Sequence, residues 1–304
     1  MYEVAIVGGG GAGITAAIYL ARKNLDVVLI EKASIGGQIV NAPIIENYPG
    51  LMGVSGLTLA QRFEEHCKAL NVKMVMDEVT EIRKLGELFK VKLASGGFIE
   101  AKAVILAIGT NYRKLNVKGE EEFIGRGISY CATCDGPLFK GKTVAVVGGG
   151  NTAFTYALYL KELCPTVYLI HRGRTFKADE VLVNKAEKAA INFKTPYTVI
   201  EILGDKLVNG LRLKNEENGK EELLTVNGVF VAIGQEVDKT LLTGLGVKLN
   251  SEGYVEVDHH MKTNIPGLFA CGDITGISNQ LIVACGQGAI AALSAYEYVK
   301  GQHP

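Results

Sequence analysis

The sequence predicts an α/β fold in which one strand–helix–strand unit occurs twice. The first observation is an internal repeat: when the chain is shifted by 140 residues against itself, 14 pairs of positions between 4 and 30 match, and 13 of them are identical. The second is a glycine-rich turn that follows the first strand of each copy. The third is size, because 304 residues at about 100–200 residues per domain predict two domains.

The same three elements are expected in each copy. Short β-branched runs predict buried parallel strands, and the helix formers between them predict a connecting helix. Two parallel strands joined in this way form a right-handed unit. The expected strand, helix and strand occupy 3–7, 13–23 and 26–30 in the first copy and 143–147, 152–163 and 166–170 in the second.

Antiparallel strands are expected after each copy. The predicted strands are 87–93 and 98–106 in the first half and 206–213 and 222–233 in the second. The last pair flanks Asn218-Gly219, which is a strong hairpin signal. Residues 242–304 match neither copy and end in a helix rich in small residues at about 280–299. This tail must join one of the two domains.

The composition argues against several classes of protein. Lysine plus arginine and aspartate plus glutamate both number 32, and a net charge of zero argues against nucleic acid or an anionic membrane as the main partner. No apolar run reaches the roughly 20 residues that span a bilayer. The first residues carry no basic segment, so no signal peptide is expected, and six cysteines are too few for a disulfide scaffold. We therefore expect a cytoplasmic protein.

The first turn, Gly8-Gly9-Gly10-Gly11-Ala12-Gly13, matches the pattern G-x-G-x-x-G between a strand and a helix. In such a turn Gly8 permits the tight bend, Gly10 lets a pyrophosphate approach the backbone, and Gly13 lets the helix pack on the strand. The helix N-terminus presents free N–H groups to the phosphates. Glu31, at the end of the second strand, is placed to accept ribose hydroxyls. A dinucleotide site is predicted, with a purely structural turn as the alternative.

Two further segments indicate which dinucleotide this is. Gly36-Gly37-Gln38 is typical of a second close approach of backbone to ligand. Asp273 follows Gly272 at a strand end, where it could hold a ribityl hydroxyl. The helix that starts near Gln280 could stabilise negative charge on a reduced isoalloxazine. These features favour a flavin, with a cap or turn role as the alternative for Asp273.

The second turn, Gly148-Gly149-Gly150-Asn151-Thr152-Ala153, matches G-x-G-x-x-A. His171 takes the position that Glu31 has in the first copy. It is followed by three basic residues, Arg172, Arg174 and Lys177. A carboxylate would repel a 2′-phosphate, whereas a basic cluster would bind one, so this site is predicted to accept NADP. A solvated basic loop is the alternative.

A redox motif, Cys131-Ala132-Thr133-Cys134-Asp135-Gly136, lies between the two turns. Two cysteines at this spacing can close a disulfide and reopen as a dithiol. Zinc would need four ligands, and the sequence has no second C-x-x-C or nearby histidine pair. Asp135 could exchange the thiol proton if burial raises its pKa, with a turn or cap role as the alternative. The other four cysteines are expected in the core.

Together these motifs resemble the low-molecular-weight thioredoxin reductases over essentially the full length of the chain. The matching segments are the turns at 8–13 and 148–153, the redox motif, Gly36-Gly37-Gln38, Glu46-Asn47-Tyr48-Pro49-Gly50 and Gly272-Asp273. The resemblance implies two Rossmann-like nucleotide-binding domains of three-layer ββα architecture, the first of them discontinuous. FAD is then expected in a domain made of 1–113 plus 242–304, and the pyridine nucleotide and the redox pair in 114–241.

The resemblance also implies roles for individual residues. Cys134 is the thiol expected to face the flavin, and Asp135 matches the proton-transfer acid that serves the Cys131–Cys134 pair. The implied FAD contacts are Gly8, Gly10, Gly13, Glu31, Gly37, Gln38, Asn47, Gly109, Asp273 and Gln280. The implied NADPH contacts are Gly148, Gly150, Asn151, Thr152, His171, Arg172, Arg174 and Lys177. The implied partner is thioredoxin or a similar small dithiol protein, and the implied assembly is a homodimer.

Three departures from the family pattern leave the redox motif and the first turn intact. The family's His-Arg-Arg-x-x-Phe-Arg-Ala reads here with Gly173 and Lys177 in place of two arginines, and lysine lacks the bidentate fork. Asn151-Thr152-Ala153 stands where the family usually has Asp-Ser-Ala, and Asn279 stands where it has arginine. NADPH is the first expectation for the electron donor. NADH, a deazaflavin and ferredoxin remain open.

Other functions on the same scaffold also remain open. One is a reductase that feeds a peroxiredoxin system, although such enzymes usually carry an extra N-terminal C-x-x-C module. Others are a flavoprotein oxidase and a redox sensor without turnover. The redox pair and the second nucleotide turn share one domain, and both must reach the flavin. We therefore expect a rotation between the domains, about the crossings near 113 and 242.

Overall fold

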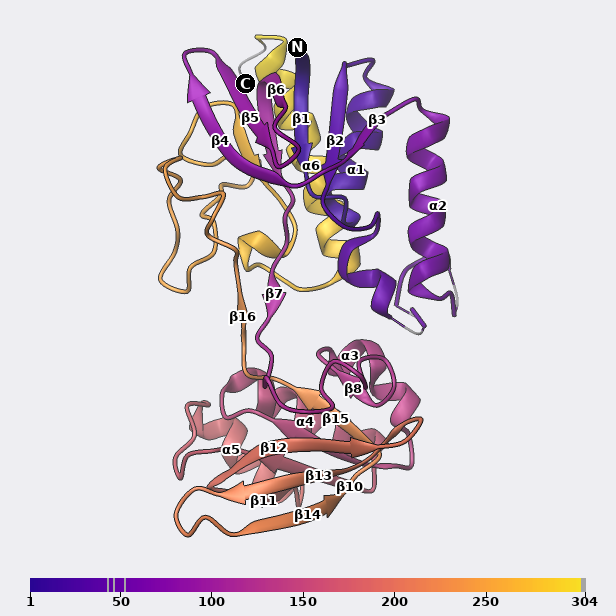
Figure 1. Ribbon diagram of the computed structural model, residues 1–304, viewed down its shortest axis with the longest axis vertical. Coiled ribbons are helices and arrows are strands. Elements are labelled where there is room, and N and C mark those ends of the chain that lie inside the picture. The colour runs from indigo at the N-terminus through magenta and orange to yellow at the C-terminus, as the bar shows by residue number, and fades with distance from the viewer. Residues whose placement is uncertain (43, 46, 52, 302–304) are drawn as a thin grey trace. The chain divides into compact units, whose positions relative to one another are not determined.

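The computed structural model describes residues 1–42, 44–45, 47–51 and 53–301, and the chain divides into two compact units (Figure 1). Unit 1 comprises Met1–Val40, Tyr48–Asn111 and Glu236–Pro304, and unit 2 comprises Asn41–Asn47 and Tyr112–Gln235. The main borders fall after residues 111 and 235, where the sequence places them after 113 and 241. The segment Asn41–Asn47 groups with unit 2, which no sequence pattern indicates.

Unit 1 is built on a seven-stranded sheet in the order β3-β2-β1-β6-β5-β4, with β17 also paired to β6. Its strands are β1 Tyr2–Val7, β2 Val27–Glu31, β3 Lys73–Met76, β4 Val79–Leu85, β5 Leu88–Leu93, β6 Phe98–Leu106 and β17 Leu268–Ala270. β1 pairs in parallel with β2 and β6, and β17 pairs in parallel with β6. β5 pairs antiparallel with both β4 and β6. The long strand β6 therefore joins the parallel and antiparallel parts of one sheet.

Successive side chains of β1 enter two different cores of unit 1. Val4 and Ile6 pack in the core that includes helices α1 (Gly11–Arg22) and α6 (Leu281–Val299). Ala5 and Val7 pack in the core that includes β4 and β5. This alternation is the period of two that a strand buried on both faces requires.

The tail of the chain completes unit 1. Helix α6 lies against α1 (Figure 1), and a Cβ atom at Gly288 would collide with the carbonyl of Ala12, so glycine allows the close approach. Helix α2 (Gly56–Ala69) begins at Ser55, whose hydroxyl accepts a hydrogen bond from the N–H of Thr58. Over the described residues, none of the helices is both long and apolar enough to span a membrane.

Unit 2 has three layers, as Figure 1 shows. The middle layer is a parallel sheet in the order β11-β10-β9-β15-β8, and one face of it is covered by the antiparallel sheet β12-β13-β14. Helix α4 (Asn151–Leu163) and helix α5 (Glu180–Lys188) pack on the other face. The strands are β8 Ile128–Ser129, β9 Thr143–Val147, β10 Thr166–Ile170, β11 Asn192–Lys194, β12 Tyr197–Gly204, β13 Val208–Asn215, β14 Glu221–Thr225 and β15 Gly228–Val231.

The expectation of one strand over 222–233 is wrong. The structure has two strands there, β14 in the antiparallel sheet and β15 in the parallel sheet. The chain changes sheet at Asn227, whose side-chain oxygen accepts from the N–H of Thr143 at 3.2 Å and whose own N–H donates to Thr143 O at 2.7 Å. Gly228 follows, where a Cβ atom would collide with the ring of Phe139. The dipeptide Asn227-Gly228 is the sequence signal for this break, because Asn-Gly pairs mark turns, and the prediction of one strand overlooked it.

Apart from the short segment Asn41–Asn47, the chain passes between the units at β7 (Asn111–Tyr112) and at β16 (Gln235–Glu236). These two strands pair with each other as a separate two-stranded sheet. On the unit 2 side the N–H of Arg113 donates to Gly234 O at 3.1 Å. The two crossings are therefore tied into one ribbon.

Candidate functional site

The first glycine turn links β1 to α1 in unit 1. A Cβ atom at Gly8 would collide with the carbonyl of Ala107, and one at Gly13 would collide with the carbonyl of Gly8. At Gly10, by contrast, no described atom lies within 4 Å of the Cβ position. Gly10 is also the N-cap of α1, and it has no side chain to satisfy the first N–H groups of the helix. The turn thus leaves open backbone where the sequence predicts a pyrophosphate.

Glu31 closes this turn from the end of β2. Its carboxylate accepts from the N–H of Gly9 at 2.6 Å and from the N–H of Ala33 at 2.8 Å, and the residue is 9% exposed. Each carboxylate oxygen can accept more than one hydrogen bond, so these contacts leave capacity for a ribose hydroxyl. Glu31 remains a predicted FAD contact, with a second role in holding the glycine backbone.

The segment Gly36-Gly37 lies directly against the first turn. Gly36 pairs with Gly10 in an isolated parallel bridge, and the N–H of Gly36 donates to Gly9 O at 2.8 Å. Gly37 has φ +58° and begins the 3₁₀ helix Gly37–Asn41. A Cβ atom at Gly37 would lie 3.2 Å from the Cα of Gly10. The two glycine segments predicted to approach a ligand are therefore neighbours in space.

Three further predicted FAD contacts are Gln38, Gly109 and Asn47. The side-chain amide of Gln38 donates to Thr110 O at 3.1 Å. Gly109 follows β6 with φ +66° and has no described atom within 4 Å of its Cβ position. Asn47 is exposed and belongs to the segment that groups with unit 2. Glu46, which shares its motif, lies outside the described residues.

Asp273 and Gln280 flank the last turn of unit 1. Asp273 follows β17 and begins a short 3₁₀ helix, Asp273–Thr275. Burial raises the pKa of its carboxyl to about 6, as expected for a group that lacks solvent. Gln280 is the N-cap of α6 and its carbonyl accepts from the N–H of Ala284 at 2.9 Å. Asp273 is thus a partly buried acidic group on the unit that carries the first glycine turn.

The second glycine turn links β9 to α4 in unit 2. A Cβ atom at Gly148 would collide with the carbonyl of Ala232, and at Gly150 no described atom lies within 4 Å. The side chain of Asn151 is already engaged: its Nδ2 donates to Asp179 at 3.0 Å and its Oδ1 accepts from the N–H of Asp179 at 2.7 Å. Thr152 is exposed at the start of α4.

The predicted basic cluster lies at this second turn. The ring of His171 occupies the place where a Cβ atom of Gly149 would be, and the N–H of Lys177 donates to Gly149 O at 2.8 Å. The guanidinium of Arg174 forms an ion pair with Glu217. Arg172 is exposed and Lys177 has an exposed side chain. The cluster is therefore local to the glycine turn, but one of its three cations already has an acidic partner.

Cys131 and Cys134 form a disulfide bond with an S–S distance of 2.10 Å. Cys131 is the N-cap of α3 (Ala132–Asp135), and its sulfur accepts from the N–H of Cys134 at 3.3 Å. The hydroxyl of Ser129 accepts from the N–H of Cys131 at 3.0 Å and lies 3.1 Å from its carbonyl. Both cysteines are partly exposed. The bond is thus held on a short helical turn with access to solvent.

Asp135 lies next to this disulfide in sequence and is partly buried, with its Oδ1 atom shielded from solvent. Burial raises the pKa of its carboxyl, and a hydrogen bond with Ser129 opposes that rise. Its Oδ1 has no hydrogen-bond partner among the described residues. Asp135 makes no capping hydrogen bond to the 3₁₀ helix Gly136–Phe139 that follows it, which disfavours the cap role. A buried carboxyl with a free oxygen is suited to take or give a proton.

Sequence reasoning misses several residues that hold these groups. Gln287 in α6 is buried, and its Oε1 accepts from the N–H of Gly272 at 2.7 Å and lies 3.3 Å from the hydroxyl of Thr275. A single amide within an apolar helix is the signal that could have revealed it. Ser129 gives no such signal. No cluster of three metal-binding side chains occurs within the part of the chain that the structure describes.

Comparison with known proteins gives a consistent result. The family described as pyridine nucleotide-disulphide oxidoreductase matches residues 2–288. The thioredoxin reductase of Helicobacter pylori is 40% identical over 309 residues, which cover 99% of each chain. The solved thioredoxin reductase of Streptococcus pyogenes is 38% identical, covers 99% of both chains and has a TM-score of 0.93. That of Lactococcus lactis in the FR conformation is 37% identical, covers 99% and 100%, and has a TM-score of 0.69.

Proposed function

The chain belongs to the pyridine nucleotide-disulphide oxidoreductase family, among the thioredoxin reductases, and from this premise we propose that it reduces the disulfide of thioredoxin or a similar small dithiol protein. The observation that carries the proposal is the Cys131–Cys134 disulfide, partly exposed and adjacent to the buried carboxyl of Asp135. A structural disulfide would need neither solvent access nor a neighbouring proton acceptor.

The family uses a flavin and a nicotinamide, and we propose FAD and NADPH for them. The residues of unit 1 fit FAD, because Gly10 leaves open backbone at a helix N-terminus and Asp273 has a partly buried carboxyl able to accept from a hydroxyl. The second turn fits a dinucleotide for the same reason at Gly150. Arg172 and Lys177 are the cations left for a 2′-phosphate, so NADH stays the alternative donor.

The chemistry of the chain's own residues follows from thiol–disulfide exchange. A flavin bound at the first glycine turn would supply two electrons, and with two protons the Cys131–Cys134 disulfide would then open to a dithiol. One of the two thiols, as a thiolate, then attacks the partner's disulfide and forms a mixed disulfide. The second thiol displaces the partner, so that the Cys131–Cys134 bond is restored and the partner leaves as a dithiol. Asp135 holds the proton that a thiol gives up or takes back.

The redox pair must meet the flavin in one step and the partner protein in another, so we propose a rotation about the β7–β16 ribbon. One solved relative supports this idea, because the thioredoxin reductase of Lactococcus lactis is described in a named FR conformation.

We also propose that the chain forms a homodimer in the cytoplasm. Ile282, Ile290 and Leu293 are exposed on α6 and lie within about 80° of one another around the helix at 3.6 residues per turn. An apolar stripe of this kind on a unit surface is typical of a protein interface. Light scattering of the purified protein measures the mass of the assembly, and a monomer would contradict this part of the proposal.

The function is tested in two steps with the purified protein. Under anaerobic conditions, NADPH is expected to bleach the flavin absorbance, and NADH to do so more slowly. Addition of oxidised thioredoxin is then expected to restore the absorbance and to produce thioredoxin thiols. A flavoprotein oxidase would instead consume oxygen without need for Cys131 or Cys134. Bleaching by neither nicotinamide would eliminate NADPH and NADH as donors.

A further inference from the structure

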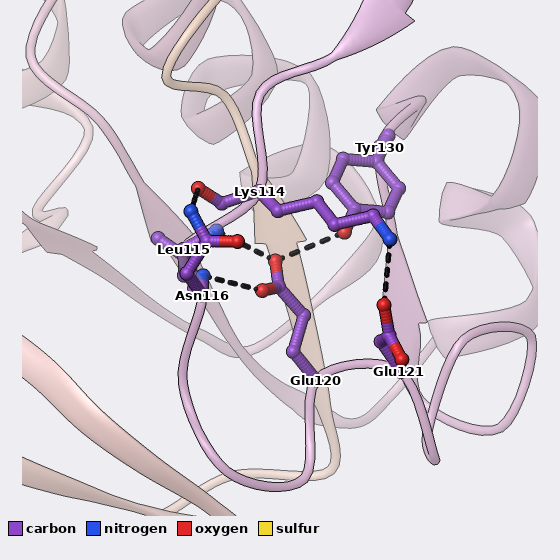
Figure 2. Close-up of polar contacts among 6 residues, drawn as sticks. All are labelled: Lys114, Leu115, Asn116, Glu120, Glu121 and Tyr130. Atoms are coloured by element: carbon purple, nitrogen blue, oxygen red, sulfur yellow. Dashed lines mark hydrogen bonds and ion pairs between the residues drawn. The ribbon is translucent and has the colours of Figure 1, made fainter.

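A buried glutamate lies a few residues after the first crossing between the units. Glu120 is 1% exposed, although glutamate is rarely buried without partners. Its Oε1 accepts from the N–H of Leu115 at 2.8 Å and from the hydroxyl of Tyr130 at 2.9 Å, and its Oε2 accepts from the N–H of Asn116 at 2.7 Å (Figure 2). Three donors thus converge on one carboxylate, and hydrogen bonds to a charged group are among the strongest.

Tyr130 is the one side chain among these donors, and it immediately precedes Cys131. Its ring stacks on the ring of Tyr112 in β7, with centroids 5.0 Å apart and an angle of 20° between the planes. Its carbonyl accepts from the hydroxyl of Tyr156 in α4 at 3.3 Å. Burial and the neighbouring Glu120 raise the pKa of Tyr130, so its hydroxyl keeps the proton that it donates. Tyr130 therefore has three separate anchors.

These anchors connect two places that matter for the proposed reaction. Tyr112 belongs to the crossing strand, whereas Cys131 belongs to the redox disulfide. Glu120 holds the loop between them, because its bonds to Leu115 and Asn116 close the chain on itself just after the crossing.

We propose that Tyr130 is a positioning residue for the Cys131–Cys134 disulfide, which it fixes to the crossing strand through its ring contact with Tyr112 and its hydrogen bond to Glu120. The consequence for turnover rests on the proposed function: a rotation at the crossing carries the disulfide with it as one rigid piece. If Tyr130 is held less firmly, the chemistry of the two cysteines is unchanged. They are, however, less often in the orientation that reaction requires.

The first test compares Tyr130→Phe with Tyr197→Phe in the holoenzyme. Tyr197 is a matched control, because its hydroxyl also donates to a carboxylate, that of Glu222 at 3.4 Å, in the same unit. Tyr130→Phe keeps the ring stack and loses only the hydroxyl. We expect kcat for thioredoxin reduction to fall about fivefold with an unchanged KM, while Tyr197→Phe stays within twofold of the wild type. Flavin content and melting temperature are measured for both variants.

The second test is a double-mutant cycle with Glu120→Gln. If Tyr130 acts through Glu120, the double variant Tyr130→Phe/Glu120→Gln loses less activity than the product of the two single losses. Multiplicative losses would show that the two residues act separately, and they would overturn the assigned coupling. Tyr130→Phe alone still measures the hydroxyl if Glu120→Gln does not fold.

The third test does not depend on thioredoxin. Hydrogen exchange of the intact holoenzyme is expected to speed up about fivefold in peptides that cover 112–116 and 128–134 in Tyr130→Phe, and not in Tyr197→Phe. Unchanged exchange in these peptides would overturn the positioning role whether or not the wild type reduces thioredoxin. A wild type that fails to reduce thioredoxin, with faster exchange in the variant, would instead remove the proposed function and leave the positioning role standing.

Discussion

The two glycine turns have similar backbones but differ in the side chain that contacts the second glycine of each turn. In unit 1 the carboxylate of Glu31 accepts from the N–H of Gly9, whereas in unit 2 the ring of His171 lies against Gly149. Glu31 is the last residue of β2 and His171 directly follows β10, and the two positions correspond in the 140-residue repeat. The backbone of the turn is thus common to both copies, while one position decides whether the side chain against it is acidic.

The units also differ in the strand segment that precedes Gly109 in unit 1 and Gly234 in unit 2. In unit 1 it is the continuous strand β6, and the unit has one main sheet. In unit 2 it is divided into β14 and β15, and the unit has two packed sheets. The two segments also differ in local sequence, because Asn227-Gly228 interrupts the second one and no glycine or asparagine occurs in 98–106. In unit 2 the hydrogen bonds of Asn227 to Thr143 and the ring of Phe139 against Gly228 hold the chain at the change of sheet.

The largest expected effect concerns the feature that only unit 2 carries. Cys134→Ser removes one sulfur of the disulfide, so thioredoxin reduction is expected to fall to background. Neither glycine turn is touched, and NADPH should still bleach the flavin. Cys164→Ser is the matched control, because Cys164 is a buried thiol of unit 2 outside the redox pair, and it should keep most of the activity. Thioredoxin reduction that survives in Cys134→Ser would remove the disulfide from the mechanism.

The second prediction tests whether the two turns serve different ligands. Gly10→Ala and Gly150→Ala each place a methyl group where no described protein atom lies within 4 Å. Both glycines have negative φ, so alanine introduces no backbone strain. Gly10→Ala is expected to weaken FAD binding more than tenfold. Gly150→Ala should keep its flavin and raise the KM for NADPH about tenfold.

Flavin absorbance and the KM for NADPH measure these two effects separately. The melting temperatures of the apoproteins serve as the control and should match the wild type. Loss of flavin in Gly150→Ala, or of NADPH binding alone in Gly10→Ala, would reverse the assignment of the turns.

The third prediction concerns the carboxyl of Asp273 in unit 1. Partial burial raises the pKa of Asp273 from its ordinary range to about 6, so the folded apoprotein keeps a proton that the unfolded chain releases at lower pH. Its contribution to stability is present below about pH 4 and is lost as the pH rises to about 6. The Asp273→Asn variant has no carboxyl at this position, so its unfolding free energy does not include this pH-dependent loss. Relative to that variant, the unfolding free energy of the wild type should fall by at most about 3 kcal/mol over this range.

Urea unfolding of both apoproteins between pH 4 and pH 8 measures the difference. A pH-independent difference would mean that Asp273 titrates normally.

Asp135→Asn tests the corresponding group in unit 2, because burial also raises the pKa of the Asp135 carboxyl. That variant should also slow thioredoxin reduction, since the amide cannot take a thiol proton.

The sequence is sufficient for the features that depend on short spacing. The glycine turns, the C-x-x-C pair and the small-residue helix follow from neighbouring residues, because local geometry fixes them. Sequence does not reveal the contact between Glu120 and Tyr130, since its energy depends on how a ten-residue loop folds back on itself. A single amide in an apolar helix marks Gln287 as unusual, but the sequence does not identify Gly272, 15 residues away, as its partner. Such contacts require coordinates.

The smallest expected effect tests the charge difference at the second turn. Glu217 pairs with Arg174 and so competes with any phosphate for that cation. Both side chains are largely exposed, and an exposed ion pair of this kind contributes about 1 kcal/mol or less. Glu217→Gln is therefore expected to lower the KM for NADPH about twofold at low salt and to leave the KM for NADH unchanged. Glu216→Gln is the matched control, because it removes the same charge from the neighbouring exposed residue. Equal effects of the two variants, or equal effects on NADPH and NADH, would show that Arg174 does not read the 2′-phosphate and that the difference between the turns lies in His171 alone.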